Sequence, residues 1–205
     1  MTDRCKECGL RSYKVHEQPI APDMKEGAEI LFLSDFPLEE DLEFGRVLSG
    51  LHRRASFLHS IIKNTKLNQD NVSHATVLRC ITKSKSVLKK EHYFHCGNYI
   101  LEDIKNHEEL KAVVCFGSVA GRLMTGKEID SIEKVRGQFF DTVIPGVFCI
   151  ITYSLGLMVD SSGCGGCGTN VQPYLARKDV QTLKKELKRR ANEERKAQAR
   201  KARKA

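Results

Sequence analysis

Four cysteines that lie far apart in the sequence put the strongest constraint on how this chain can fold. Cys5 and Cys8 form a CxxC motif near its beginning, Cys80 follows a strand-like run, and Cys96 opens a helical stretch. A CxxC pair and two further thiolates that only folding brings close can hold a 4Fe–4S cluster or a tetrahedral zinc ion. The polar neighbours of Cys5, Cys8 and Cys96 favour ligation over ordinary burial, and we expect an iron–sulfur cluster.

The other cysteines leave an alternative open. Cys115 in AVVCFG and Cys149 in VFCIITY lie inside apolar runs, where a free thiol behaves as a small hydrophobic residue. Cys164 and Cys167 form a second CxxC motif, CGGC, within the glycine-rich residues 160–171, which we expect to be a loop. Paired with the first CxxC motif, they would form a zinc site with two knuckles.

The beginning of the chain, MTDRCKECGL, is polar and charged and has no apolar signal segment. We therefore expect an intracellular, reducing location, cytoplasmic or associated with the nucleoid, in which thiols are available to a metal. Residues 143–159 carry no charge, but this stretch is short for a membrane span and contains Pro145, Gly146 and Gly156. No membrane partner is expected.

Strand-like runs alternate with helical patterns along the chain. Runs with the composition of buried strands occupy residues 30–33, 74–80, 111–117 and 147–153. Apolar residues recur at helical spacing in residues 46–66 and 96–110, a short helix is expected from Ser118, and one long helix from Leu175. This alternation predicts an α/β fold: a three-layer α/β/α sandwich with a mainly parallel four-stranded sheet and a basic helical tail at the C-terminus.

The positive charge of the chain is concentrated at its end. Residues 177–205 contain 13 Lys or Arg and 4 Asp or Glu, a net charge of +9, so residues 1–176 carry 21 minus 22, or −1. We therefore divide the chain into a domain of residues 1–176 and a helical or disordered tail of residues 177–205. Such a tail is either a solvated extension, a docking arm for a protein, or an arm that binds DNA. The expected DNA contacts on it are Lys184, Lys185, Lys188, Arg189 and Arg190.

The first predicted strand delivers polar groups to the carboxyl edge of the sheet, where ligands of open α/β sheets gather. The loop that follows it, DFPLEEDLEFG, begins at Asp35 and is the first candidate site. Its acidic run, residues 39–43, is also consistent with a solvated turn.

The order of these motifs resembles the iron–sulfur (family 4) branch of the uracil-DNA glycosylase superfamily, over nearly the whole span from Cys5 to about Leu187. The corresponding segments are CKEC, SDFPL at 34–38, GRVLSG at 45–50, VLRC at 77–80, Cys96, FGSVA at 116–120, Arg136-Gly137 and TYSLG at 152–156. The resemblance implies that Cys5, Cys8, Cys80 and Cys96 bind a 4Fe–4S cluster.

The resemblance also implies a pocket that receives a flipped base. Its expected residues are Phe36, Pro37, Leu48 and Thr76, with Asp35 and Ser154 as catalytic residues. The chain departs from the family here, because Leu48 replaces an aromatic residue, Thr76 an asparagine, and Ser154 a histidine. Loss of base stacking and of a donor to the developing charge would together slow uracil excision by on the order of 10³- to 10⁵-fold.

These departures favour a DNA-binding protein with weak or absent uracil excision over an efficient glycosylase. We expect an accessory factor of DNA replication or repair, whose partner could be a DNA polymerase or another replication protein, with Arg53, Arg54 and Arg136 as further DNA contacts. One alternative is an active glycosylase with altered base specificity, in which Asp35 orients water and Ser154 donates a hydrogen bond. The other is a metal-stapled structural module without nucleic-acid function.

Overall fold

The computed structural model describes residues 5, 8–14, 19–48, 52–82, 88–159 and 171–202, and the side chain of Arg11 is outside this description. In these residues a single sheet has the strand order β2-β1-β3-β5-β4. Four strands are parallel: β1 (Ile30–Ser34), β2 (Val72–Thr76), β3 (Ala112–Phe116) and β5 (Phe148–Thr152). The α/β class and the mainly parallel sheet are therefore confirmed.

The expected strand count of four is wrong, because a fifth strand, β4 (Phe139–Asp141), pairs antiparallel with β5. It has three residues and lies at the edge of the sheet, so its side chains are only half-buried or exposed. A strand this short shows no clear alternation of apolar and polar residues, and the sequence pattern missed it. The second strand also ends earlier than expected, at Thr76, which leaves Cys80 in an irregular segment beyond it.

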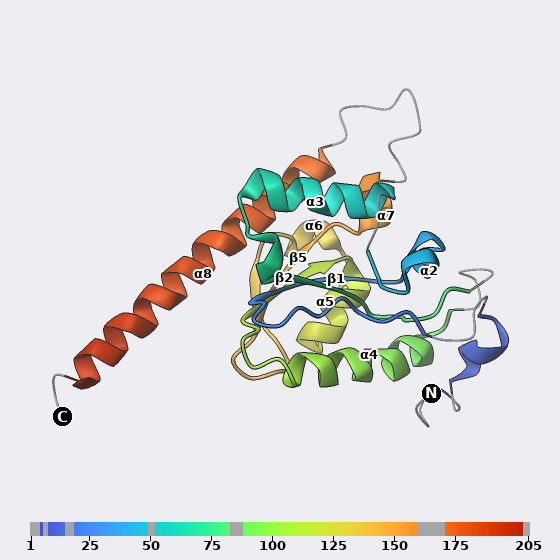
Figure 1. Cartoon of the computed structure of the whole chain (residues 1–205), viewed down its shortest axis with the longest axis horizontal. Helices are drawn as coiled ribbons and strands as arrows, with labels where there is room; N and C mark the ends of the chain where they lie inside the picture. The colour runs from blue at the N-terminus through green and yellow to red at the C-terminus, as the bar shows by residue number, and fades with distance from the viewer. Residues whose placement is uncertain are drawn as a thin grey trace.

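Helices cover both faces of the sheet (Figure 1). Their bounds are α2 (Glu40–Phe44), α3 (Arg53–Thr65), α4 (Lys90–Lys105), α5 (Ser118–Thr125), α6 (Ile132–Val135), α7 (Leu155–Val159) and α8 (Gln172–Ala202), with 3-10 turns η1 (Gly9–Ser12) and η2 (Gln69–Asn71). The two predicted helices are confirmed with different bounds: α3 is shorter than expected at both ends, and α4 begins earlier, at Lys90, and ends earlier, at Lys105. None of the helices in the described part of the chain is long and apolar enough to cross a membrane.

The hydrophobic core forms on both sides of the sheet because alternate residues of each strand point to opposite faces. From β1, Phe32 packs with residues of α3 and α8, including Leu58 and Leu183. Its neighbour Leu31 packs on the other side, with residues of α4 and α5 such as Ile100. All five residues of β1 are buried, as expected for a parallel sheet covered on both faces.

Helix α8 has a packed first half and an exposed second half. It begins at Gln172, ahead of the residue 177 at which the charge pattern divides the chain, and it buries Ala176, Asp179, Val180 and Leu183 against the body. Residues 192–202 are exposed, and Figure 1 shows this end of the helix running away from the sheet. The predicted long helix is confirmed, but its first half belongs to the core.

Candidate functional site

Asp35 lies directly after β1 at the carboxyl edge of the sheet, as the sequence predicts. Its Oδ1 accepts a hydrogen bond from the backbone N–H of Ala120, at 3.2 Å, in the first turn of α5. Gly117, which connects β3 to α5 with φ +116°, allows this approach, because a Cβ atom there would lie 2.6 Å from Asp35 Oδ2. The glycine is therefore needed both for its backbone angle and for the space it leaves.

Burial raises the pKa of the Asp35 carboxyl group from 3.8 to about 6. The Ala120 N–H and the charges of Arg54 and Arg122 oppose this shift, but burial dominates. A carboxyl group that titrates close to neutrality can exchange a proton with water or a substrate, which is the property needed in general acid–base catalysis. Asp35 is therefore chemically suited to the role that the resemblance implies.

Ser154 follows β5 at the same edge of the sheet. Its Oγ accepts a hydrogen bond from the backbone N–H of Leu157, at 3.3 Å, and so caps the short helix α7. The hydroxyl proton is not used in this contact. Ser154 can therefore cap the helix and still donate a hydrogen bond.

The structure separates the four expected base-pocket residues into two pairs. Phe36 and Pro37 line a pocket of about 230 Å³, together with Arg54 and Cys80, and the Arg54 guanidinium lies 5.3 Å from the centre of the Phe36 ring. Leu48 and Thr76 are buried and do not line this pocket.

Both residues of the buried pair are used by the fold. The Thr76 hydroxyl donates to the carbonyl oxygen of Leu78 at 2.5 Å. Leu48 packs in the core with φ +53°, and its N–H donates to Asp41 at 2.6 Å. Their positions in the sequence gave no indication of these contacts.

A buried Asp–His pair holds the loop between β1 and α3. Asp41 is fully buried and accepts hydrogen bonds from the N–H groups of Leu38 and Leu48 and from His52 Nε2, at 2.8, 2.6 and 3.1 Å. The His52 Nδ1 accepts from the Ala55 N–H at 3.4 Å, so Nε2 is the nitrogen that carries the proton. The acidic run was interpreted as a site loop or a solvated turn, and neither interpretation singled out Asp41.

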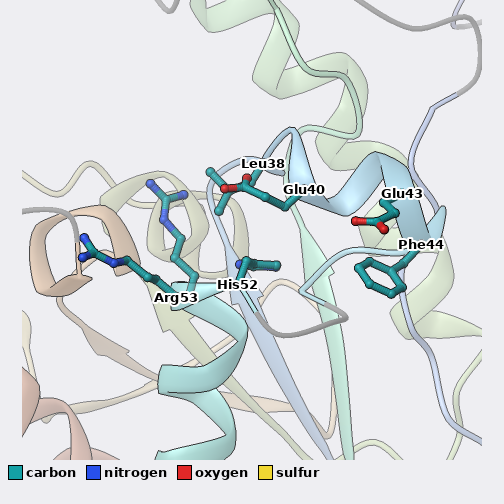
Figure 2. Close-up of a pocket in the computed structure, with 7 residues that line it drawn as sticks. Leu38, Glu40, Glu43, Phe44, His52 and Arg53 are labelled. Carbon is teal, nitrogen blue, oxygen red and sulfur yellow. The ribbon is translucent and has the colours of Figure 1, made fainter.

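Between α2 and α3 lies a larger pocket of about 590 Å³, which we call the α2–α3 pocket. It is lined by Leu38, Glu40, Glu43, Phe44, His52, Arg53 and Arg54. Figure 2 shows Glu43 and Phe44 on the α2 side, Arg53 on the α3 side and His52 between them. Arg53 and Arg54 were expected to contact DNA, and the candidate site loop contains four more of these residues, Leu38, Glu40, Glu43 and Phe44, whereas His52 was not predicted.

Cys5, Cys8, Cys80 and Cys96, which we call the cysteine group, come together in the fold. The pKa of the Cys80 thiol is raised to about 12, first by burial and then by the neighbouring Cys96, Cys5 and Cys8, against the charge of Lys14. Cys8 and Cys96 also pack in one small apolar cluster. Among the residues that the structure describes, no three His, Cys, Asp or Glu side chains form a metal-binding group. Cys164 and Cys167, the alternative zinc ligands, lie outside the described residues.

Several of the predicted DNA contacts have partners within the protein. Arg136 donates to Asp179 Oδ1 at 2.8 Å, and Arg54 is only 4% exposed. Lys184 Nζ donates to the carbonyl oxygens of Thr65 and Lys66 at the end of α3, at 2.8 and 2.5 Å.

The remaining predicted DNA contacts fall into a paired and an exposed set. Arg189 pairs with Glu186 and Glu193, and Arg190 pairs with Glu186. Arg190 also lies 3.9 Å from the centre of the Phe148 ring. Arg53, Lys185 and Lys188 are exposed.

Neither the comparison with protein-family models nor the comparison with curated proteins finds a match for this chain.

Proposed function

We propose that this chain is a DNA-binding protein built on the scaffold of an iron–sulfur uracil-DNA glycosylase, with weak or absent uracil excision, and that it serves DNA replication or repair. The observation that carries the proposal is the convergence of the cysteine group. Cys80 is close enough to Cys5, Cys8 and Cys96 for their thiols to act on its pKa. Ordinary core cysteines have no reason to gather from such distant positions.

In this proposal the cysteine group holds a 4Fe–4S cluster. Four thiols are the donor set that such a cluster requires, and the charges of Lys14 and Arg79 act on Cys80 and Cys96 in the direction that favours the thiolate form. The cluster would supply a covalent staple between the start of the chain, the segment after β2 and the middle of α4.

Weak excision follows from what the residues near Asp35 can do. Asp35 can accept a proton from water, and Ser154 can donate one hydrogen bond to a departing base. Thr76 and Leu48 are already engaged in the fold, and the Arg54 guanidinium lies against the Phe36 ring on which a base could otherwise stack. A base would therefore be held and activated poorly.

A second candidate function is an active glycosylase for a base other than uracil. The pKa of about 6 at Asp35 favours it, because a buried carboxyl group tuned to this range is costly to keep without a use. Here a modified base would have to make contacts that do not need Thr76 or Leu48.

One assay on the full chain separates the two. Excision is measured on uracil and on a panel of damaged bases, in single- and double-stranded oligonucleotides, beside a binding titration on the same oligonucleotides. Binding with little or no excision of any base supports the first function. Excision of a damaged base that Asp35→Asn abolishes, and that rises with pH through about 6 in the parent protein, supports the second. Absence of both DNA binding and excision contradicts both.

The cluster is tested by metal and sulfide analysis of protein purified without oxygen. We expect a brown protein that contains iron and acid-labile sulfide. Cys80→Ser should lose the iron and much of the folded protein, whereas Cys164→Ser, the matched control from the second CxxC motif, should keep both. Stoichiometric zinc without iron would overturn the cluster, and zinc lost from Cys164→Ser would favour the site with two knuckles.

A further inference from the structure

We propose that the α2–α3 pocket binds a nucleotide whose base carries an exocyclic amino group. This inference goes beyond the proposed function, because neither Asp35, Ser154 nor any of the four cysteines lines the pocket. It rests on the two oppositely charged walls of the pocket and on the aromatic ring beside them. The volume of the α2–α3 pocket, about 590 Å³, lies within the range of sites that hold small ligands, ~300 to 1,000 Å³.

The α3 wall is positive. Arg53 and Arg54 stand in the first turn of a helix of 13 residues that has no acidic residue there. Both guanidinium groups therefore add to the positive end of the helix dipole, where acidic residues are normally preferred. Arg54, which is 4% exposed, adds a second positive charge to this wall. A phosphate group, which accepts paired hydrogen bonds from arginine, suits this wall.

The α2 wall is acidic and aromatic. Glu40 and Glu43 are exposed carboxylates, and the Phe44 ring, which is 50% exposed, lies beside Glu43 (Figure 2). Two carboxylates repel a bare anion such as inorganic phosphate. They accept hydrogen bonds from N–H groups, however, and Phe44 offers a face on which a flat ring can stack.

One class of ligand can make favourable contacts with both walls of the pocket. In a nucleotide, the phosphate would lie at Arg53 and Arg54, the base would stack on Phe44, and its amino group would donate to Glu40 or Glu43. Adenine, cytosine and guanine carry such an amino group. Thymine and uracil have no amino group, and their single N3–H lies between two carbonyl oxygens that repel a carboxylate, so they should bind more weakly. The ligand can be a free nucleotide or a nucleotide within a single DNA strand, since the chemistry is the same.

The test is a titration of the full chain with dAMP, dCMP, dTMP and inorganic phosphate. Binding is measured by calorimetry and by changes in the amide chemical shifts. We expect dAMP and dCMP to bind more tightly than dTMP, and inorganic phosphate to bind least. Phe44→Ala should weaken dAMP binding by ~5- to 150-fold, the value of one base–aromatic stack. Phe94→Ala, an equally conservative change of a ring that is 68% exposed on α4, should leave it unchanged.

Two further variants address the two walls separately. The double variant Glu40→Gln, Glu43→Gln should lose the preference for dAMP over dTMP, and Arg53→Gln should bind dAMP little better than deoxyadenosine. A short single-stranded oligo(dA) that binds far more tightly than dAMP, and that loses affinity in Phe44→Ala by the same factor as dAMP does, identifies the ligand as a strand nucleotide. Oligo(dA) binding that Phe44→Ala leaves unchanged identifies the ligand of the pocket as a free nucleotide. The inference is overturned if millimolar dAMP does not bind, if dTMP binds equally well, or if Phe44→Ala and Phe94→Ala behave alike. None of these outcomes depends on iron content or on base excision.

Discussion

His74 on β2 is buried in a form that cannot easily be charged. It is 4% exposed, its ring meets the Phe32 ring edge-on at 5.7 Å between centroids, and within the described residues its Nδ1 has no hydrogen-bond partner. Burial lowers the pKa of His74 to about 3, and the charges of Lys25 and His59 act in the same direction. The imidazole is therefore neutral in the folded protein.

This burial makes the stability of the fold depend on pH. The unfolded chain takes up a proton at His74 below its ordinary pKa of 6.5, whereas the folded chain does so only near 3, so folding loses stability as the pH falls through that window. The loss from this residue is about 3 kcal/mol near pH ~4, as an order of magnitude. His74→Leu should flatten the pH dependence of urea unfolding between these values. Asp35, whose raised pKa has the opposite effect, is common to both proteins and cancels in the comparison. If the free energy of unfolding depended on pH in the same way in the parent and in His74→Leu, His74 would not be buried in its neutral form.

Individual side chains mark how far the sequence alone could predict this site. Asp35 could be placed, because a polar residue after a buried strand must lie at the carboxyl edge of the sheet. Asp41 could not, because a carboxylate within an acidic run gives no sign that its particular position faces inward. Leu48 and Thr76 were aligned to a pocket from their order in the chain. Order does not determine whether a short side chain reaches a pocket or a nearby backbone group.

At the scale of elements, helix α8 is held to the body by polar contacts as well as by its apolar residues. Asp179 accepts hydrogen bonds from the Thr152 hydroxyl on β5 and from Arg136, both at 2.8 Å. Gly137 lies so close that a Cβ atom there would be 2.9 Å from Asp179 Oδ1. Lys184 adds hydrogen bonds to the last carbonyl groups of α3. This half of α8 is thus a structural element rather than part of a mobile tail.

Removal of the Asp179 carboxylate should destabilise the fold strongly. Asp179→Ala would leave the Arg136 guanidinium, which is mostly buried, and the Thr152 hydroxyl without their acceptor, at a cost of ~3 kcal/mol in the free energy of unfolding. Glu193→Ala removes an exposed ion pair with Arg189 on the same helix and should cost less than ~1 kcal/mol. Urea unfolding of the two variants measures the difference. Equal effects would mean that the apolar residues alone hold α8 in place.

Elements with many buried residues could be predicted from the sequence, and elements with few could not. The helical pattern of residues 46–66 contains α3, whose Leu58, Ile61 and Ile62 point to the core. Three short elements bury few side chains: the helices α2 and α6 and the edge strand β4. Their apolar residues therefore show no clear periodicity in the sequence. The pattern also placed the start of this helix too early. Val47 is buried and so fits the apolar spacing, but it lies in a loop before α3.

For the whole molecule, the projecting half of α8 changes where a DNA-binding arm would begin. The charge pattern indicated residues 177–205, but Lys184, Arg189 and Arg190 all have partners within the protein. Residues 192–205 contain six Lys or Arg and two Glu, a net charge of +4. As far as the described residues extend, to Ala202, every residue of this segment is exposed. It is therefore the part of the helix that can approach a phosphate backbone without disturbing the fold.

Truncation after Ala191 tests the proposed arm more sharply than truncation after Leu187, because it spares the packing of Arg190 on Phe148. If the six basic residues each meet a phosphate, the full chain should lose about 10³-fold in DNA affinity between ~50 and ~200 mM salt, through release of counterions. The chain truncated after Ala191 should bind the same oligonucleotide more weakly at low salt and show a much flatter salt dependence. Its free energy of unfolding should fall by less than ~1 kcal/mol, because among the described residues only the exposed Arg189–Glu193 pair is lost. Titration of both proteins at several salt concentrations gives the two slopes. Equal slopes would assign DNA binding to the body of the protein, and the exposed half of α8 would then be left as a docking arm for a protein or a solvated extension.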